Sequence, residues 1–293
     1  MLPKGYLSAT ITARDDFAED LATFHLRPDE PLDFEPGQYA TLALEIGGKL
    51  VKRAYSIASP PHAEDLEFYV ECVRDGVLTP CLWDLQSGST LFIRRKIVGH
   101  FTLDTVRTQH VMAATVTGLA PFLSIVLDQQ HRLETGTHDG VLHRFLILHG
   151  ASVSGELGPY RERCSDLAAE FDWFDYVPTI SRPWKEPGWA GETGRVEELL
   201  RKWMDRAGFD ADHAAGYACG NPQMIENAKG ILKRARLAEE AIHEEKYFTT
   251  PAGETTSEVA AAPVATPKPK RPPSRKPPPG AMKLKAVKRP PTA

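Results

Sequence analysis

The chain has 293 residues, a formal net charge of −4 at pH 7 and 42% apolar residues, which is an ordinary composition for a folded protein. This length allows two domains, each with its own core. No apolar run approaches the ~20 residues of a membrane helix, and the first residues lack the apolar stretch of a secretion signal. We therefore expect a cytoplasmic protein that does not bind membranes.

Residues 251–293 differ in composition from the rest of the chain. They hold eleven prolines, nine Lys or Arg and two Glu, a net charge of +7, which leaves −11 on the other 250 residues. With few large apolar side chains this segment cannot bury enough surface to fold, so we predict a disordered tail. The acidic body argues against nucleic acid as the partner, because like charges repel.

Residues 1–104 show the signals of a strand-rich domain. Short segments rich in β-forming residues are separated by turn residues such as Pro36-Gly37 and Ser87-Gly88. Short strands at near-regular spacing predict an antiparallel β-barrel. A short helix near Pro80–Leu85 interrupts it. The predicted strands are Tyr6–Thr12, Thr23–Leu26, Gln38–Leu44, Leu66–Val70 and Thr90–Ile93.

Residues 105–250 alternate between strands and helices, which predicts a parallel sheet covered by helices, a Rossmann-like nucleotide-binding domain. Ligands bind such sheets at the carboxyl ends of the strands, where both Thr117-Gly118 and Cys219-Gly220 fall. The predicted strands are His110–Ala114, Phe145–Leu148, Trp173–Thr179 and Gly216–Cys219. The predicted helices are Phe122–Gln130, Tyr160–Ala169, Val196–Ala207 and Gln223–Arg236.

The first motif, Arg53-Ala54-Tyr55-Ser56, lies on an alternating strand with Arg53 and Tyr55 on one side. Arg suits a phosphate through its fork of donors. Tyr packs flat on a heteroaromatic ring, and Ser offers a small donor beside it. Taken alone, the segment fits an amphipathic strand with a surface Arg better than a ligand site.

The second motif, Gly76-Val77-Leu78-Thr79, opens the predicted short helix. Backbone N–H groups at a helix start attract phosphate, helped by the helix dipole. Thr79 also suits the N-cap position of that helix. The two interpretations are compatible.

Two further motifs lie at strand ends of the second domain. Thr117-Gly118 occupies the position where an α/β sheet cradles pyrophosphate, but without a GxGxxG fingerprint it fits a tight turn equally well. Glycine in Cys219-Gly220 permits close approach of a ligand, whereas a lone buried cysteine is more often structural. Neither the four cysteines nor the ten histidines show metal-ligand spacing, so we expect reduced thiols and no metal site.

In this order and at these separations, the motifs resemble the ferredoxin–NADP reductase family over about residues 5–248. The segment Glu245-Lys246-Tyr247-Phe248 adds to the resemblance. The resemblance implies FAD bound by residues 1–104 and NADP(H) bound by residues 105–250. It also implies hydride transfer between NADP(H) and FAD, and single-electron transfer between FAD and ferredoxin or flavodoxin. That carrier is expected to be a separate protein, because the chain has no cysteine set for an iron–sulfur cluster.

The resemblance also implies residue roles. Tyr55 and Tyr247 would cover the two faces of the flavin, Phe248 would lie toward the adenine, and Ser56 would bond near flavin N5. Thr117 and Cys219 would frame the nicotinamide, with the Glu245 carboxylate nearby. The catalytic set is therefore Ser56, Cys219, Glu245 and Tyr247. The cofactor-binding set is Arg53, Ala54, Tyr55, Ser56, Gly76, Val77, Leu78, Thr79, Thr117, Gly118, Ser181, Arg182, Arg195, Cys219, Gly220, Tyr247 and Phe248.

Two residues depart from the family pattern. Val116 stands where the family usually has Gly, and Ser152 stands where many members place an Arg that helps to hold NADP. Arg182, after a strand, and Arg195, at a helix start, are then the residues expected to bind the 2′-phosphate. Two alternatives use the same scaffold, an NADH-dependent reductase component of an oxygenase and a flavin-binding electron-transfer subunit of a larger complex. We expect a monomer.

Overall fold

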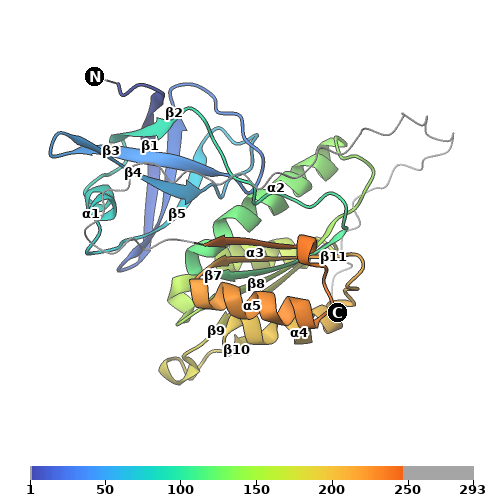
Figure 1. The fold of residues 1–293 in the computed structure, drawn as a ribbon. Coiled ribbons are helices and arrows are strands. Elements are labelled where there is room, and N and C mark those ends of the chain that lie inside the picture. The colour runs from blue at the N-terminus through green and yellow to red at the C-terminus, as the bar shows by residue number, and fades with distance from the viewer. Residues whose placement is uncertain (1, 247–293) are drawn as a thin grey trace, which may run out of the picture.

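The computed structural model describes residues 2–246, which form two domains packed against each other (Figure 1). The predicted tail, residues 251–293, lies outside the described residues, and so do Tyr247 and Phe248. In the described part of the chain, no helix is long and apolar enough to cross a membrane.

The first domain is a six-stranded antiparallel sheet with the order β4-β3-β6-β1-β2-β5, curled as a barrel-like layer (Figure 1). In β1, Leu7, Ala9 and Ile11 are buried at alternate positions, because successive side chains of a strand point to opposite faces. The predicted β-barrel architecture is confirmed. The strands are β1 (Tyr6–Ala18), β2 (Leu21–Pro28), β3 (Tyr39–Ile46), β4 (Lys49–Ser56), β5 (Leu66–Glu71) and β6 (Thr90–Arg94).

The short helix α1 (Leu78–Trp83) begins two residues before the predicted start. Val77, not Thr79, occupies the N-cap position, and it makes no side-chain cap bond. The Thr79 hydroxyl instead donates to the Val73 carbonyl and accepts from the Val73 N–H, each at 3.0 Å. The N-cap interpretation of Thr79 is therefore wrong, because this side chain closes the turn between β5 and α1.

The second domain is a six-stranded parallel sheet with the order β10-β9-β8-β7-β11-β12. All predicted strands and helices of this domain are present. The strands are β7 (Gln109–Thr115), β8 (Arg144–Ala151), β9 (Phe174–Ile180), β10 (Glu192–Thr193), β11 (Ala214–Gly220) and β12 (Ile242–Lys246). The α-helices are α2 (Ala120–Thr135), α3 (Tyr160–Glu170), α4 (Val196–Ala207) and α5 (Pro222–Arg234).

Helices cover both faces of the parallel sheet (Figure 1). Residues of α2 and α3 share a core with one face, and residues of α4 and α5 share a core with the other. Strand β7 lies between β8 and β11. The chain adds β8, β9 and β10 on one side of β7, and then β11 and β12 on the other side. In such sheets the crevice beyond the carboxyl ends of the two strands at this switch point is the usual ligand site.

The two domains are joined by a buried interface. The rings of Tyr69, in β5, and Tyr160, in α3, stack with centroids 4.6 Å apart. Arg163 Nη1 lies 2.9 Å from Glu67 Oε2, and Glu67 is only 6% exposed. Because these contacts come from both domains, they hold the barrel in a defined position on the parallel sheet.

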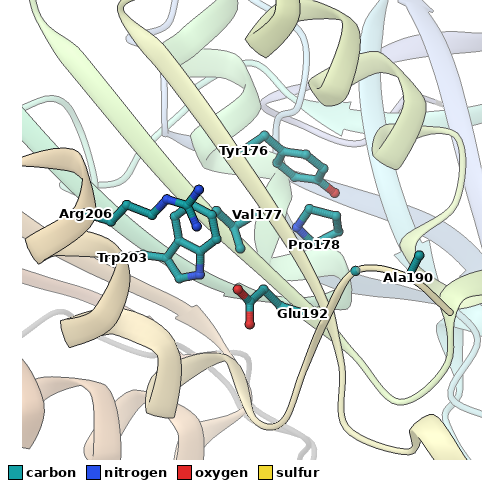
Figure 2. Close-up of a pocket in the computed structure, with 8 residues that line it drawn as sticks. Tyr176, Val177, Pro178, Ala190, Glu192, Trp203 and Arg206 are labelled. Atoms are coloured by element: carbon teal, nitrogen blue, oxygen red, sulfur yellow. The ribbon is translucent and has the colours of Figure 1, made fainter.

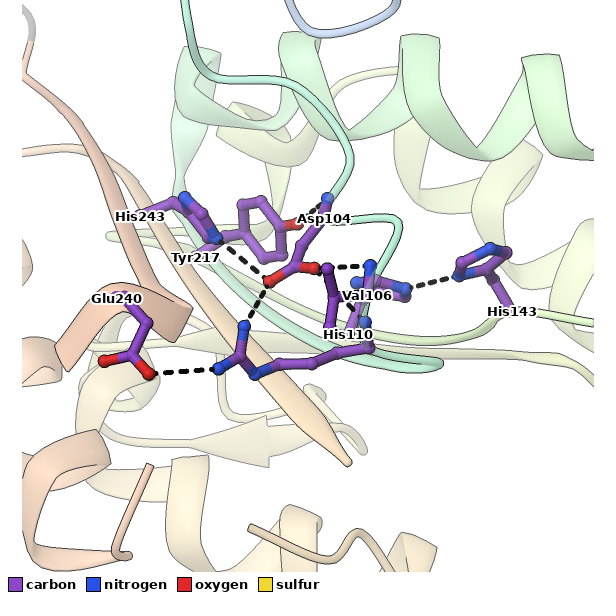
Figure 3. Close-up of polar contacts among 8 residues, drawn as sticks. Asp104, Val106, His110, His143, Tyr217, Glu240 and His243 are labelled. Atoms are coloured by element: carbon purple, nitrogen blue, oxygen red, sulfur yellow. Dashed lines mark hydrogen bonds and ion pairs between the residues drawn. The ribbon is translucent and has the colours of Figure 1, made fainter. Parts of the chain in front are cut away.

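The segment between the domains is tied to the last two strands (Figure 3). The backbone N–H of Asp104 donates to the Tyr217 hydroxyl at 2.7 Å, and Arg107 Nη1 donates to Asp104 Oδ2 at 2.7 Å. The His243 ring stacks on Tyr217 with centroids 4.7 Å apart, and its Nε2 lies 3.7 Å from the same carboxylate oxygen. These contacts anchor the start of β12, which carries Glu245.

Candidate functional site

The carboxyl end of β4 meets the carboxyl end of β12 at a hydrogen bond between the two domains. The buried Ser56 hydroxyl donates to Glu245 Oε2 at 2.8 Å. Burial raises the pKa of the Glu245 carboxyl, and the bond from Ser56 offsets this only in part. The pair therefore combines a hydroxyl with a carboxyl that retains its proton more readily than an exposed Glu does.

Cys219 lies beside this pair. In the parallel ladders it is the partner of Glu245 in β12 and of Ala114 in β7, and it is fully buried. The structure thus brings together three of the four predicted catalytic residues, Ser56, Cys219 and Glu245. The fourth, Tyr247, lies outside the described residues.

The loops after β7 and β11 are in close contact. A Cβ placed on Gly118 would stand 2.2 Å from the Cys219 carbonyl oxygen, and one on Gly220 would stand 2.2 Å from Thr115 Oγ1. The Asn221 N–H donates to the same Thr115 oxygen at 2.8 Å. Only glycine fits at either position, so both glycines have a packing reason to be there.

Val116 has a φ of +45°, a left-handed conformation that glycine adopts freely and a β-branched residue avoids. Such strain costs about 1–3 kcal/mol. The side chain of His149, in β8, bonds to the Val116 carbonyl with Nε2 at 2.9 Å from the oxygen. His149 is not among the predicted site residues, although a valine at a glycine position implies that some other contact supports the turn.

The predicted flavin-binding motif lies on β4, with one side chain packed against the barrel core and two exposed to solvent. Tyr55 is half-buried and packs against the barrel core, and burial raises the pKa of its hydroxyl. Arg53 and Ala54 are exposed, and Arg53 Nη1 donates to the Lys52 carbonyl at 2.8 Å. The exposed guanidinium and half-buried ring suit a ligand with a phosphate and a flat ring.

Ser181 and Arg182 continue from β9, and the Arg182 N–H donates to the Ser152 carbonyl at 3.0 Å. Arg195 is the N-cap residue of α4. The preceding residue, Gly194, donates its N–H to the carbonyl of Ile180, the last residue of β9, at 2.9 Å. Both arginines are therefore near the end of β9, and both are exposed. Within residues 2–246, no carboxylate forms an ion pair with either guanidinium.

Two carboxylates that the sequence analysis did not identify line the loop after β8. Glu156 Oε2 accepts the Ser152 N–H at 2.6 Å, and Glu186 Oε1 accepts the Ser154 N–H at 3.0 Å. This loop lacks the arginine that many family members place at position 152. A carboxylate near the ribose favours NAD over NADP in such folds, because it accepts from the 2′-hydroxyl and repels a 2′-phosphate.

A pocket of about 430 Å³ opens at the β9–β10 edge of the parallel sheet (Figure 2). None of the predicted site residues lines it, so it is separate from the Ser56–Glu245 pair. Among residues 2–246, no three His, Cys, Asp or Glu side chains form a group that could hold a metal ion. The pocket is lined by Tyr176, Val177, Pro178, Ala190, Gly191, Glu192, Trp203 and Arg206.

Comparison with known proteins agrees with this two-domain arrangement. Residues 8–102 match the oxidoreductase FAD-binding domain family, and residues 112–230 match the oxidoreductase NAD-binding domain family. The chain is 30% identical over 232 residues to the ferredoxin–NADP reductase of Azotobacter vinelandii, covering 73% of this chain and 84% of that protein.

Other relatives serve oxygenases. The chain is 30% identical over 254 residues to the reductase component of phenol 2-monooxygenase from Pseudomonas sp. strain CF600, covering 85% of this chain and 67% of that protein. The fold matches a solved ferredoxin NADP+ reductase from Neisseria gonorrhoeae with bound FAD and NADP. That match has a TM-score of 0.72 at 24% identity, covering 84% of this chain and 100% of that one.

Proposed function

The chain belongs to the ferredoxin–NADP reductase family of oxidoreductases, with an FAD-binding and an NAD-binding domain, and from this premise we propose its reaction. It transfers a hydride between NADP(H) and FAD, and single electrons between FAD and a separate ferredoxin or flavodoxin. The observation that carries the proposal is the Ser56–Glu245 hydrogen bond beside Cys219, where the two domains meet.

The residues of the barrel fit an FAD molecule. Tyr55 offers a half-buried flat ring, Arg53 an exposed guanidinium, and Gly76 a tight turn before the exposed Val77. In this proposal Tyr55 packs on the flavin ring, while Arg53 and the Gly76–Thr79 turn hold the pyrophosphate. FAD supplies the hydride and one-electron chemistry, and the protein supplies position and electrostatics.

Ser56 and Glu245 supply a proton path in this proposal. With Glu245 ionised, the Ser56 hydroxyl donates to Oε2. With Glu245 protonated, the carboxyl donates to Ser56 Oγ, and the Ser56 hydroxyl donates to a different acceptor. The raised pKa of Glu245 makes the protonated form accessible nearer neutral pH than for an exposed Glu.

The crevice between β7 and β11 binds the nicotinamide nucleotide in this proposal. Gly118 and Gly220 bring backbone close to the ligand, and Cys219 provides a buried wall rather than a nucleophile. Arg182 and Arg195 contact the 2′-phosphate. Trp184, which is 72% exposed and two residues after Arg182, offers an aromatic face for the adenine.

A second candidate is an NADH-dependent reductase that supplies electrons to an oxygenase. Glu156, Glu186 and the missing arginine at Ser152 favour it, because all three weaken binding of a 2′-phosphate. The similarity to an oxygenase reductase component also supports it.

Steady-state kinetics on the purified yellow protein distinguish the two candidates. NADPH and NADH are compared as donors, with ferricyanide, ferredoxin and flavodoxin as acceptors. The main proposal predicts a higher kcat/KM with NADPH and reduction of ferredoxin or flavodoxin. A higher kcat/KM with NADH, together with no reduction of either carrier, would favour the oxygenase reductase. Chromatography of the heat-released flavin tests for FAD, and FMN alone would contradict the predicted pyrophosphate site.

A further inference from the structure

His149 connects the strained turn at Val116 to the edge of the parallel sheet. Its side chain is fully buried in β8. Its Nε2 lies 2.9 Å from the Val116 carbonyl oxygen, and its Nδ1 lies 2.9 Å from the hydroxyl of Tyr176 in β9. The same tyrosine forms a wall of the edge pocket (Figure 2).

These two bonds allow one arrangement of hydrogens on a neutral ring. A carbonyl oxygen only accepts, so the ring hydrogen is on Nε2. Nδ1 then carries a lone pair and accepts from the Tyr176 hydroxyl. Burial lowers the pKa of His149 to about 4 and raises that of Tyr176, so both side chains stay neutral near pH 7.

The direction of the Val116 carbonyl determines the path of the loop. The peptide bond after Val116 is planar and trans, so the Thr117 N–H points opposite to the carbonyl and away from His149. Two residues after Val116, Gly118 packs directly on the Cys219 carbonyl. A change in the turn would therefore move Thr117 and Gly118 relative to Cys219, and these residues form the two sides of the proposed nicotinamide crevice.

We propose that His149 is a positioning residue for nucleotide binding, which holds Val116 in the left-handed conformation while Tyr176 fixes the tautomer of its ring. This inference rests on the proposed function, because it assigns the loop after β7 to the nicotinamide nucleotide. His149 does not touch the nucleotide, and it acts only through the backbone of Val116.

The proposal makes the effect of His149 depend on the residue at position 116. Glycine adopts a positive φ without strain, so in the Val116→Gly variant the turn no longer needs the histidine. If His149 contributed only to stability, its substitution would have the same effect with Val or with Gly at position 116. The test is therefore a double-mutant cycle of His149→Leu with Val116→Gly.

The cycle is read by titrating the purified flavoprotein with NADP+, and in parallel with NAD+, by isothermal calorimetry. We expect His149→Leu to weaken binding of the preferred nucleotide about tenfold, the effect of losing one good hydrogen bond. In the Val116→Gly background the loss should be threefold or less. With ferricyanide as acceptor, KM for the reduced nucleotide should rise more than kcat falls.

Tyr176→Phe provides a second cycle that keeps the ring and its packing, in case His149→Leu does not fold. Its loss of affinity, expected to be twofold to fivefold, should also shrink in the Val116→Gly background. His110→Leu is the matched control, because His110 is equally buried but lies at the opposite end of the sheet, in β7. It should leave nucleotide affinity unchanged in both backgrounds.

The outcomes separate this inference from the proposed function. Equal losses of affinity in the Val116 and Val116→Gly backgrounds, or no loss in either, would overturn the role of His149. If the unaltered protein binds neither NADP+ nor NAD+, the proposed function itself fails.

Discussion

The Ser56 hydroxyl lies 2.8 Å from Glu245 Oε2, although the two residues are 189 positions apart in the chain. Ser56 ends a strand of the barrel and Glu245 belongs to an edge strand of the parallel sheet. The pair exists only when both domains are folded and docked. Substituting either residue of the pair therefore tests whether the active site lies at the interface between the domains.

Glu245→Gln should lower kcat for the NADPH–ferricyanide reaction at least tenfold, because positioned proton transfer contributes 10²- to 10⁴-fold. The raised pKa also sets a sign for the pH dependence. If the protonated carboxyl is the active form, activity falls as pH rises through this pKa, and the variant lacks that fall.

A pH series of kcat checks this prediction. The control is Glu244→Gln, because Glu244 is exposed and pairs with Lys229 at 2.8 Å. The proton path would be rejected if Glu245→Gln kept the pH profile and kcat of the unaltered protein.

Arg195→Ala and Arg182→Ala should each raise KM for NADPH about ten- to hundredfold, because a charge-assisted bond is worth roughly 1.5–3 kcal/mol. KM for NADH should change little, since NADH lacks the 2′-phosphate. Arg201→Ala is the control. Arg201 lies within α4, the helix that Arg195 caps, and it forms an ion pair with Asp205 at 2.9 Å. Equal changes with both nucleotides would count against the assignment.

Glu186→Gln tests whether the Glu186 carboxylate weakens binding of NADPH by repelling its 2′-phosphate. Removing this charge should improve kcat/KM for NADPH by about threefold to tenfold, because surface charges contribute roughly 1 kcal/mol. The amide retains an acceptor for the Ser154 N–H, which the carboxylate accepts at 3.0 Å. An unchanged ratio of kcat/KM for NADPH and NADH would show that Glu186 does not influence nucleotide choice.

Arg163→Ala should destabilise the protein by about 2–3 kcal/mol, because it leaves the Glu67 carboxylate buried without its charged partner. Glu67 is 6% exposed and lies 2.9 Å from Arg163 Nη1. Urea unfolding measures the effect. The exposed pair Arg201–Asp205 provides the comparison, and its loss should cost less than about 0.5 kcal/mol. If breaking either pair lowered the free energy of unfolding by a similar amount, burial of Glu67 would not explain the effect of Arg163→Ala.

His110 should make the protein sensitive to acid. Burial is the main reason that the pKa of His110 is lowered to about 3, and the charge of the neighbouring His143 is the second reason. In an unfolded chain the pKa of a histidine is near ~6.5. Between these values the unfolded chain takes up a proton that the folded protein does not, so stability falls as pH falls. His110→Phe should flatten this slope in urea unfolding between about pH 6 and pH 4. An unchanged slope in His110→Phe would refute the prediction.

The sequence by itself determined the two-domain organisation and most of the helices and strands. These features depend on local patterns: alternation in β1, buried apolar runs in β7 and β8, and an Asn-Pro start for α5, where Asn221 accepts from the N–H groups of Gln223 and Met224. The motifs also led to the prediction of Ser56, Cys219 and Glu245 as site residues, because their residue types and order resemble a known family.

The tertiary structure alone decided how distant residues meet. Strand β12 escaped the sequence analysis because Ile242–Lys246 is mostly polar, and it is a strand only because β11 offers it a paired edge. The sequence shows Val116 at a position where glycine is usual, but it does not show the bond from His149, since no local pattern reports a contact between residues 33 positions apart. Local periodicity depends only on residues a few positions apart, whereas the candidate site is assembled from the ends of β4, β7, β11 and β12, which belong to two domains.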